Sequence, residues 1–290
     1  MHASQTGRFQ RVAPIRKFVL LISLAVLAGL SACTGLETNL QDTEVSYEST
    51  ARRNFESGEK AFTDERYNEA IKFFEHVKNQ FPYSKYAVLA ELRIADAHFE
   101  REKWLEAADT YRLFVRFHPR HEQVSHAIWR IAVSYNEEMK KGFFLLPAPH
   151  ETDLSATEDA IRAFDDYLRR YPAGEHHEEA RELRTQARTR LAEHDMYAAG
   201  FYLQREKWQG ALWRYEHVAA AFADTPRAPT ALLAAGQICA EQLARPEDGR
   251  AYLNRLLEQY PDAPEVEAAK ELLSELVGSA GGAERTSEAN

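Results

Sequence analysis

Histidines are the side chains of this chain whose number and spacing could support metal chemistry. The segment HEQVSH, from His121 to His126, comes close to the HExxH spacing that places two histidines on one helix face to bind zinc. Here the histidines are one residue too far apart, which turns them about 140° away from each other around a helix. His118 and His121 flank a proline, and His176 and His177 are adjacent at an expected helix start. We therefore predict no metal site.

Motifs of nucleophilic, nucleotide or redox chemistry are missing from the sequence as well. It contains no GxSxG segment, no phosphate-binding loop and no GxGxxG segment. The acidic pair Asp165 and Asp166 lies on an expected helix, where charged side chains normally face solvent. Cys239 lies in an apolar context and is expected to be a buried, inert thiol. We predict a protein that is not an enzyme and needs no cofactor.

The composition narrows the class of partner. The 290 residues include 36 Lys and Arg against 45 Asp and Glu, a formal net charge of −9. A nucleic-acid-binding protein normally needs a basic face to neutralise phosphates, so we expect no nucleic-acid partner. A local exception is the basic segment with Arg112, Arg116 and Arg120, which either meets a carboxylate-bearing partner or makes local ion pairs.

The first 33 residues have the order of an export signal. Residues 1–17 carry basic side chains and no acid, residues 18–32 (FVLLISLAVLAGLSA) are uncharged, and Cys33 follows directly. This arrangement resembles the bacterial lipoprotein signal, which implies removal of residues 1–32 and acylation of Cys33, palmitate included. Thr34 replaces the aspartate of an inner-membrane retention signal, so the resemblance implies the outer membrane, on its periplasmic face. The polar residues 33–48 are expected to form a lipidated tether.

An internal repeat organises the rest of the chain. Four segments end in an aromatic residue or histidine followed by proline, at Phe81-Pro82, His118-Pro119, Tyr171-Pro172 and Tyr260-Pro261. A small residue stands twelve positions before each proline, at Ala70, Ala107, Ala160 and Gly249. A large residue stands eight positions before each proline, at Phe74, Tyr111, Phe164 and Leu253. A further copy has Ala211 and Tyr215 in register, with Ala223 in place of the proline. These positions resemble the tetratricopeptide repeat, a helix–turn–helix unit of about 34 residues.

The repeat predicts an all-α fold, a right-handed superhelical solenoid of about five helix pairs with a C-terminal capping helix. Apolar periodicity places helices at 50–64, 67–80, 84–101, 104–117, 122–140, 157–170, 176–206, 208–222, 227–242, 247–259 and 264–277. We divide the chain into repeats 1–3 at 49–175, repeats 4–5 with the cap at 176–277, and a disordered tail at 278–290. An insert at 141–157 with the apolar run Phe143 to Leu146 interrupts the third repeat, and it either contacts a partner or packs on the repeats.

Several segments carry a more specific resemblance. The FPYSKYA turn, the segment AADTYRLFVRFHPRH and the insert GFFLLP are similar to those of the BamD (ComL-like) family of outer-membrane lipoproteins, part of the β-barrel assembly machinery. The resemblance covers about residues 50–261 and weakens after 223, where Phe222-Ala223 stands for the usual Tyr-Pro. It implies a non-enzymatic scaffold that acts with other assembly-complex lipoproteins. Its partners would be the POTRA domains of a BamA-like barrel protein and C-terminal signals of unfolded outer-membrane proteins.

The resemblance also implies where these partners bind. An aromatic-lined groove suits an extended apolar peptide, and the first three repeats offer several candidates. The candidate client-binding residues are Phe55, Phe62, Phe81, Tyr83, Tyr86, Phe99 and Trp129. The alternative for each of these residues is that it packs between repeats and does not contact a ligand. Arg214 matches the family position that pairs with an acidic residue of BamA, and Tyr202 lies near it in the alignment, so these two are the expected partner site.

Two other protein classes remain open at this point. A different periplasmic repeat lipoprotein, such as a secretin pilotin or an envelope or division scaffold, has the same signal and the same kind of repeat. An accessory domain of a cell-wall hydrolase or metalloprotease is a second alternative. Co-purification with the barrel-assembly partner would distinguish a BamD-like protein from the first class. A test for bound zinc or hydrolysis would distinguish it from the second class.

Overall fold

The computed structural model describes residues 45–140 and 154–288, with side chains described up to residue 277. Every regular element in these ranges is a helix, and Val45–Asn290 forms one unit in which consecutive helices contact each other. Cys33, where we expect acylation, the expected signal at 1–32 and most of the apolar insert lie outside the described residues. None of the described helices is both long enough and apolar enough to cross a bilayer.

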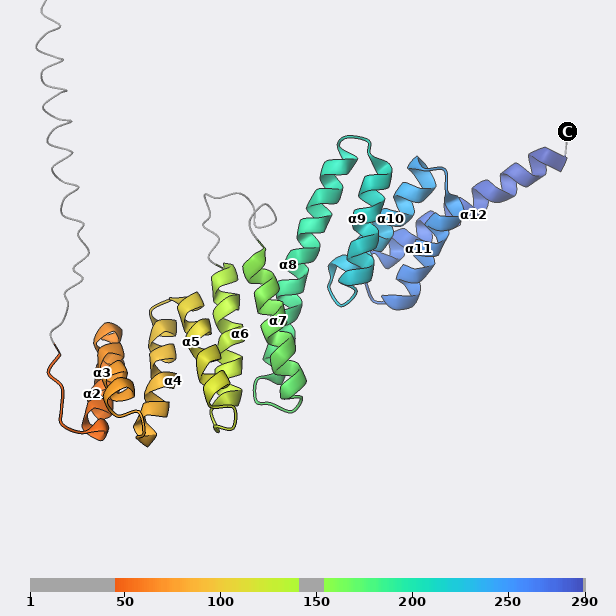
Figure 1. The fold of residues 1–290 in the computed structure, drawn as a ribbon. Coiled ribbons are helices and arrows are strands. Elements are labelled where there is room, and N and C mark those ends of the chain that lie inside the picture. The colour runs from red at the N-terminus through yellow and green to blue at the C-terminus, as the bar shows by residue number, and fades with distance from the viewer. Residues whose placement is uncertain (1–44, 141–153, 289–290) are drawn as a thin grey trace, which may run out of the picture. The chain divides into compact units, whose positions relative to one another are not determined.

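The helices form the five expected pairs and the cap (Figure 1). Their bounds are α2 (Ala51–Thr63), α3 (Tyr67–Gln80), α4 (Lys85–Glu100), α5 (Trp104–Phe117), α6 (Val124–Lys140), α7 (Ser155–Arg170), α8 (His177–Leu203), α9 (Trp208–Ala221), α10 (Arg227–Gln237), α11 (Pro246–Gln259) and α12 (Val266–Glu288). Units 1 to 5 are the pairs α2/α3, α4/α5, α6/α7, α8/α9 and α10/α11. The first helix of a unit is the one that comes first in the chain. The predicted all-α repeat fold is confirmed.

The repeat positions act as the sequence analysis expected. Ala70, Phe74 and Val77 are all fully buried between α2 and α3, and the side chains in register in the other units are buried as well. Gly58 shows how close the helices approach, because a Cβ built there would stand 2.6 Å from the Phe74 ring. Each of α3, α5, α7 and α11 ends just before an aromatic residue or histidine and its proline, which cannot continue a helix.

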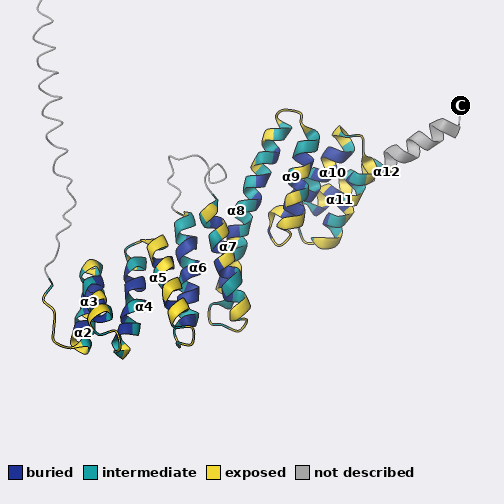
Figure 2. Ribbon diagram, viewed as in Figure 1, coloured by how far each residue is buried: buried dark blue, intermediate teal, exposed yellow. Residues whose placement is uncertain are grey.

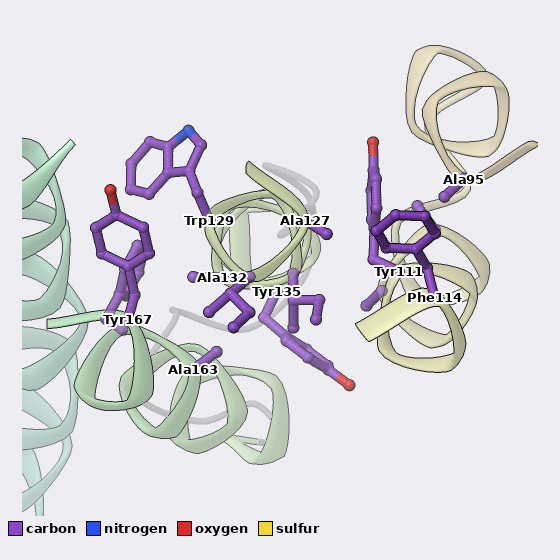
Figure 3. Packing of buried hydrophobic residues seen from close by; sticks show 14 of the residues in the cluster. Ala95, Tyr111, Phe114, Ala127, Trp129, Ala132, Tyr135, Ala163 and Tyr167 are labelled. Carbon is purple, nitrogen blue, oxygen red and sulfur yellow. The ribbon is translucent and has the colours of Figure 1, made fainter. Parts of the chain in front are cut away.

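Burial is concentrated where neighbouring helices face each other (Figure 2). The cluster around α6 illustrates this, since α6 lies between Tyr111 and Phe114 of α5 on one side and Tyr167 of α7 on the other (Figure 3). Long α8 serves two clusters: Ala180 packs with α6 and α7, whereas Ala199 packs with α9 and α10. Both ends of one helix are therefore fixed by different units.

Four of the five turns inside units contain a left-handed residue that is not glycine. These residues have positive φ of 51° to 59°, and they are Glu65, Glu102, Glu206 and Ala244. Unit 3 has its insert at this position. The repeated backbone geometry therefore places side chains where glycine is preferred, a cost of about 1–2 kcal/mol each.

Three boundaries differ from the expectation. Residues 45–48 belong to the folded part, because Tyr47 stacks on His76 at 3.9 Å and the buried Asn54 amide donates to the Glu48 carbonyl at 2.7 Å. The last helix, α12, continues to Glu288, past residue 277 where we expected it to end. Helix α10 runs into one turn of π-helix at Ile238–Gln242, which shifts the periodicity before α11.

Candidate protein-binding surfaces

The first helices of units 1 and 2 present two phenylalanines at equivalent positions, and each is covered by an arginine of the following first helix. The Arg93 guanidinium of α4 lies 4.0 Å from the ring centroid of Phe62 in α2. The Arg130 guanidinium of α6 lies 3.4 Å from the ring centroid of Phe99 in α4. A planar cation over a ring face is attracted to the ring quadrupole. Two of the candidate aromatic residues, Phe62 and Phe99, are therefore each paired with a guanidinium group of the next unit.

Acidic residues hold both arginines in place. Arg93 donates to Glu59 with two nitrogens, at 2.6 and 3.0 Å, and to Asp96 at 2.9 Å. Arg130 donates to Glu100 at 3.2 Å. Fork-to-carboxylate pairing of this kind fixes the plane of the guanidinium group as well as its position. The arginines are thus set before any ligand arrives.

Asp96 and Tyr111 join the two arginines into one chain of contacts. The Tyr111 hydroxyl donates to the Asp96 carboxylate at 2.5 Å and accepts from Arg130 at 3.1 Å. Burial would raise the pKa of Asp96, but His126, whose ring nitrogen lies 3.9 Å from the carboxylate, and the hydrogen bonds from Tyr111 and Arg93 outweigh it and hold that pKa below its ordinary value. Burial, followed by the negative charge of Asp96, raises the pKa of Tyr111. The network keeps one buried negative charge beneath a surface of paired arginines, glutamates and aromatic rings.

The remaining candidates, in α2, at the start of α4 and in the turn between α3 and α4, fall into two groups. Phe55 and Tyr86 meet with ring centroids 5.5 Å apart, and Phe55 also packs on buried Phe74 at 5.4 Å. In the turn after α3, Phe81 packs edge-on against His76 at 5.9 Å and is half-buried. Tyr83 differs from all of them, because it is fully exposed. Tyr83 is therefore the candidate with the most surface to offer a ligand.

Trp129 has a different environment from the other candidates. It is only 6 % exposed, and its ring stacks on His176 at a centroid distance of 4.4 Å. Phe164 and Tyr167 of α7 pack on its other sides, and Tyr167 is seen beside it in Figure 3. Its surface is used in packing within unit 3 and against His176 before α8, so we leave Trp129 out of the contact surface proposed below.

The two expected partner residues lie in unit 4, on neighbouring helices. Arg214 of α9 donates to the Asp195 carboxylate of α8 at 2.8 Å, and its side chain stays 44 % exposed. His217 of α9 meets the other oxygen of the same carboxylate at 2.7 Å. Tyr202 of α8 is half-buried, and it packs against Gly210, where a Cβ would stand 2.9 Å from its ring. Arg214 is therefore positioned by a buried acid and keeps part of its guanidinium open to solvent.

Exposed aromatic residues of the same unit were missed by the sequence analysis. Tyr197 and Phe201, one turn apart on α8, are 47 % and 48 % exposed, and Trp213, next to Arg214, is 64 % exposed. Arg205 covers Phe201 at 3.4 Å. The repeat register could have indicated them, because these large apolar residues stand at positions that the repeat does not use for its core. Exposed aromatic residues are enriched at protein–protein interfaces.

The histidines of the sequence analysis have ordinary roles in packing and polar contacts. His118 bonds to Glu91 at 2.8 Å, and the His121 ring nitrogen accepts from the Gln123 amide at 3.2 Å. In the parts of the chain that the structure describes, no three His, Cys, Asp or Glu side chains gather as metal ligands would. Cys239 is fully buried, and that burial raises the pKa of its thiol, as expected of a core residue.

Comparisons with known proteins add the family. The sequence model of the YfiO family, described as outer membrane lipoprotein, matches residues 47–245, and a tetratricopeptide-repeat model matches residues 230–263. Several relatives carry the name outer membrane protein assembly factor BamD, and two of them show the extent of the similarity. The one from Neisseria meningitidis serogroup A is 25 % identical over 86 % of this chain and 93 % of its own length. The one from Caulobacter vibrioides is 25 % identical over 77 % of this chain and 70 % of its own length.

Among solved structures, the TPR2AB domain of yeast Sti1 in its pHSP90 complex is similar, with a TM-score of 0.39 and 16 % identity. That match covers 82 % of this chain and 94 % of the yeast domain. The lipoprotein family match spans well over half of the chain and includes both candidate surfaces. The chain therefore belongs to the BamD family of outer membrane lipoproteins.

Proposed function

We propose that this chain is a non-enzymatic scaffold of the outer-membrane β-barrel assembly complex. Its relatives are named outer membrane protein assembly factors, which supports a role in that process. The finer assignment has two parts: the first helices of units 1 to 3 bind C-terminal signals of unfolded outer-membrane proteins, and unit 4 binds the POTRA region of a BamA-like protein. The tether with acylated Cys33 would hold the scaffold on the periplasmic face of the outer membrane.

The observation that carries the client-binding part is the series Phe62–Arg93 and Phe99–Arg130. A signal that ends in an aromatic strand brings a ring and a terminal carboxylate close together. A guanidinium group that already lies over a ring suits both, because it can bind a carboxylate at its edge while aromatic faces stack around it. The side chains of Glu59 and Glu100 are 38 % and 41 % exposed, so a ligand carboxylate can reach both guanidinium groups and compete with these acids for them.

Tyr83, Phe81 and the Phe55–Tyr86 pair extend this surface at the end of unit 1. The backbone of this turn is fixed by a hydrogen bond from the Ser84 amide to the Phe81 carbonyl, whereas the Tyr83 side chain is fully exposed and can rotate onto a ligand. Rigid aromatic groups bring large contact area at low entropic cost. These four aromatic residues would thus hold the preceding residues of the strand while the arginines bind its end.

Titration with a synthetic peptide tests the client-binding part. The probe is a fluorescent decapeptide with alternating apolar residues and a C-terminal phenylalanine, compared with the same peptide ended by an amide. We expect the Phe62→Ala and Phe99→Ala variants each to weaken binding about 10-fold, since an aromatic contact of this kind contributes about 1–2 kcal/mol. The amide peptide should lose a similar factor.

The matched control is Leu105→Ala, which removes a 46 % exposed apolar side chain that is not part of the proposed client surface from a second helix. Its affinity should equal that of the unaltered chain, with all variants showing the same helical circular dichroism. Equal binding of the acid and amide peptides, together with unchanged affinity in both phenylalanine variants, would refute the client-binding proposal.

A further inference from the structure

Helix α5 carries two rows of exposed side chains that neither proposed surface uses. Leu113 and Phe117, one turn apart, are 51 % and 66 % exposed. Arg112 and Arg116 form a parallel row, displaced by one residue, and both are exposed. Residues four apart on a helix lie on one face. An apolar stripe and a basic stripe therefore run side by side along α5, on a second helix, whereas the client surface lies on first helices.

Each stripe borders its own groove. The apolar stripe lines a groove of about 210 Å³ over α4, between α3 and α5, whose other walls include Ile94 and Phe114. The basic stripe lines a groove of about 340 Å³ over α6, between α5 and α7. The floor of this second groove is apolar, made of Ile128, Ile131, Val115 and Ala163. Two shallow grooves thus lie on either side of α5.

The second groove is rich in guanidinium groups although the chain as a whole is acidic. Four arginines and one acid line it: Arg112, Arg116, Arg162, Arg170 and Asp166. Asp166 is already bonded to Arg170 at 3.0 Å, and Arg162 pairs with Asp159 at 2.5 Å.

Arg112 and Arg116 have more capacity left than the other two arginines. Arg112 meets Asp109 only at 3.4 Å, and its guanidinium lies 4.8 Å from the centre of the Tyr135 ring, which holds it toward the groove. Arg116 makes no ion pair with any residue that the structure describes. The groove therefore presents two guanidinium groups with unused donors above an apolar floor.

We propose that this α3–α5–α7 face is a third docking surface, for an acidic amphipathic segment of another protein. Such a segment would cross α5, with apolar side chains in the groove beside Leu113 and Phe117 and carboxylates on Arg112 and Arg116. Arginine forks bind individual carboxylates in a fixed geometry. A flat anionic membrane is a poorer match, because acids on the neighbouring turns (Asp109, Glu158, Asp159 and Asp166) cancel much of the net charge that a membrane would sense.

Site-specific photocrosslinking of the full chain in its own cell envelope tests this surface. p-Benzoylphenylalanine replaces Leu113 in one variant and, as the control, Arg181 on α8, whose side chain is 63 % exposed at a hollow lined by glutamates. Mass spectrometry then identifies the crosslinked segment. We expect adducts from position 113 to a protein segment that contains several acidic residues beside apolar ones. The double charge reversal Arg112→Glu with Arg116→Glu should reduce their yield about fivefold or more, as expected for loss of contacts worth about 1 kcal/mol.

Three outcomes would overturn the proposal. The first is adducts at position 113 that are no more abundant than at position 181. The second is adducts to lipid, to a second copy of this chain, or to a segment without acidic residues. The third is an unchanged yield in the charge-reversed variant. The double variant must show native helical circular dichroism, and Arg112→Gln with Arg116→Gln provides a milder version if it does not. Because this surface lies apart from those under the proposed function, either can fail alone.

Discussion

Replacing Arg214 by glutamine separates a structural role from a role in partner binding, which the sequence alone cannot do. In the folded chain Arg214 donates to Asp195, whose side chain is 8 % exposed, while His217 donates to the other oxygen. Arg214→Gln leaves that acid with His217, so we expect the free energy of unfolding to fall by only about 1 kcal/mol. The charge reversal Arg214→Glu would place a second carboxylate beside Asp195 and confuse the two effects.

The affinity for a partner should change much more than the stability. If the exposed part of the guanidinium meets an acid of a BamA-like protein, its removal costs about 2 kcal/mol, which is about a 30-fold weaker Kd. Isothermal titration with the partner's periplasmic domains measures this value, and urea unfolding measures the stability of the same variant.

The variant Asp195→Asn provides the matched control. It weakens the internal pair and lowers stability, but it leaves the arginine charge available, so partner affinity should stay the same or rise. The reasoning would be refuted by an Arg214→Gln affinity within about twofold of the unaltered chain, or by Asp195→Asn weakening binding as much as Arg214→Gln does. The second result would show that Arg214 acts only by holding α8 against α9.

Three further predictions concern the scaffold, and urea unfolding followed by circular dichroism checks each of them. Gly58→Ala should destabilise the chain by about 1–3 kcal/mol because its Cβ would meet the Phe74 ring at 2.6 Å, whereas Gly200→Ala, with no neighbouring atom within 4 Å, should stabilise it by about 0.5–1 kcal/mol. Equal effects at the two glycines would contradict the packing argument. Glu102→Gly should stabilise the chain by up to about 1 kcal/mol by relieving a left-handed residue with φ of 58°, and a loss of stability would show that the glutamate side chain matters more than its backbone. Because the pKa of Asp96 is lowered in the folded state, its contribution is present above its unfolded pKa of about 3.9 and is lost as pH falls through the lower folded value. Stability should therefore drop below about pH 4 less steeply in Asp96→Asn, and an unchanged slope would contradict the assignment.

The helices and their pairing could be predicted because the repeat places its core residues at fixed distances. Ala70 and Phe74 are spaced by one turn, their counterparts recur in each unit, and all prove to be buried. The expectations that were wrong concern the two ends of the fold. Gly278, Gly281 and Gly282 are typical of a helix end, yet α12 continues through them to Glu288. The start of the fold depends on Asn54, which binds a segment with the composition of a polar linker.

The candidate surfaces were less accessible to sequence reasoning. Aromatic residues such as Phe62 and Trp129 look alike in a repeat pattern, and only packing decides that the first stays partly open while the second is buried among three other rings. The arginine partners have no local signal either, because Arg93 lies on a different helix from the ring that it covers. A signal did exist in the register: Arg93 and Arg130 are separated by the same number of residues as Phe62 and Phe99.

The regular spacing of these ring–arginine pairs determines which features of a peptide the surface would recognise. Each pair spans two units, so the distance between one pair and the next is set by the stacking of first helices and not by any flexible loop. In each pair the acid that holds the guanidinium, Glu59 or Glu100, is more exposed than the arginine itself. An incoming carboxylate therefore has to displace only an exposed acid, while buried Asp96 keeps Arg93 in position throughout. Because the arginine is already held in position, little conformational entropy is lost when the peptide binds. The site recognises only the charge and the aromatic ring of the peptide. Such a site suits a scaffold whose clients share an ending but differ elsewhere in sequence.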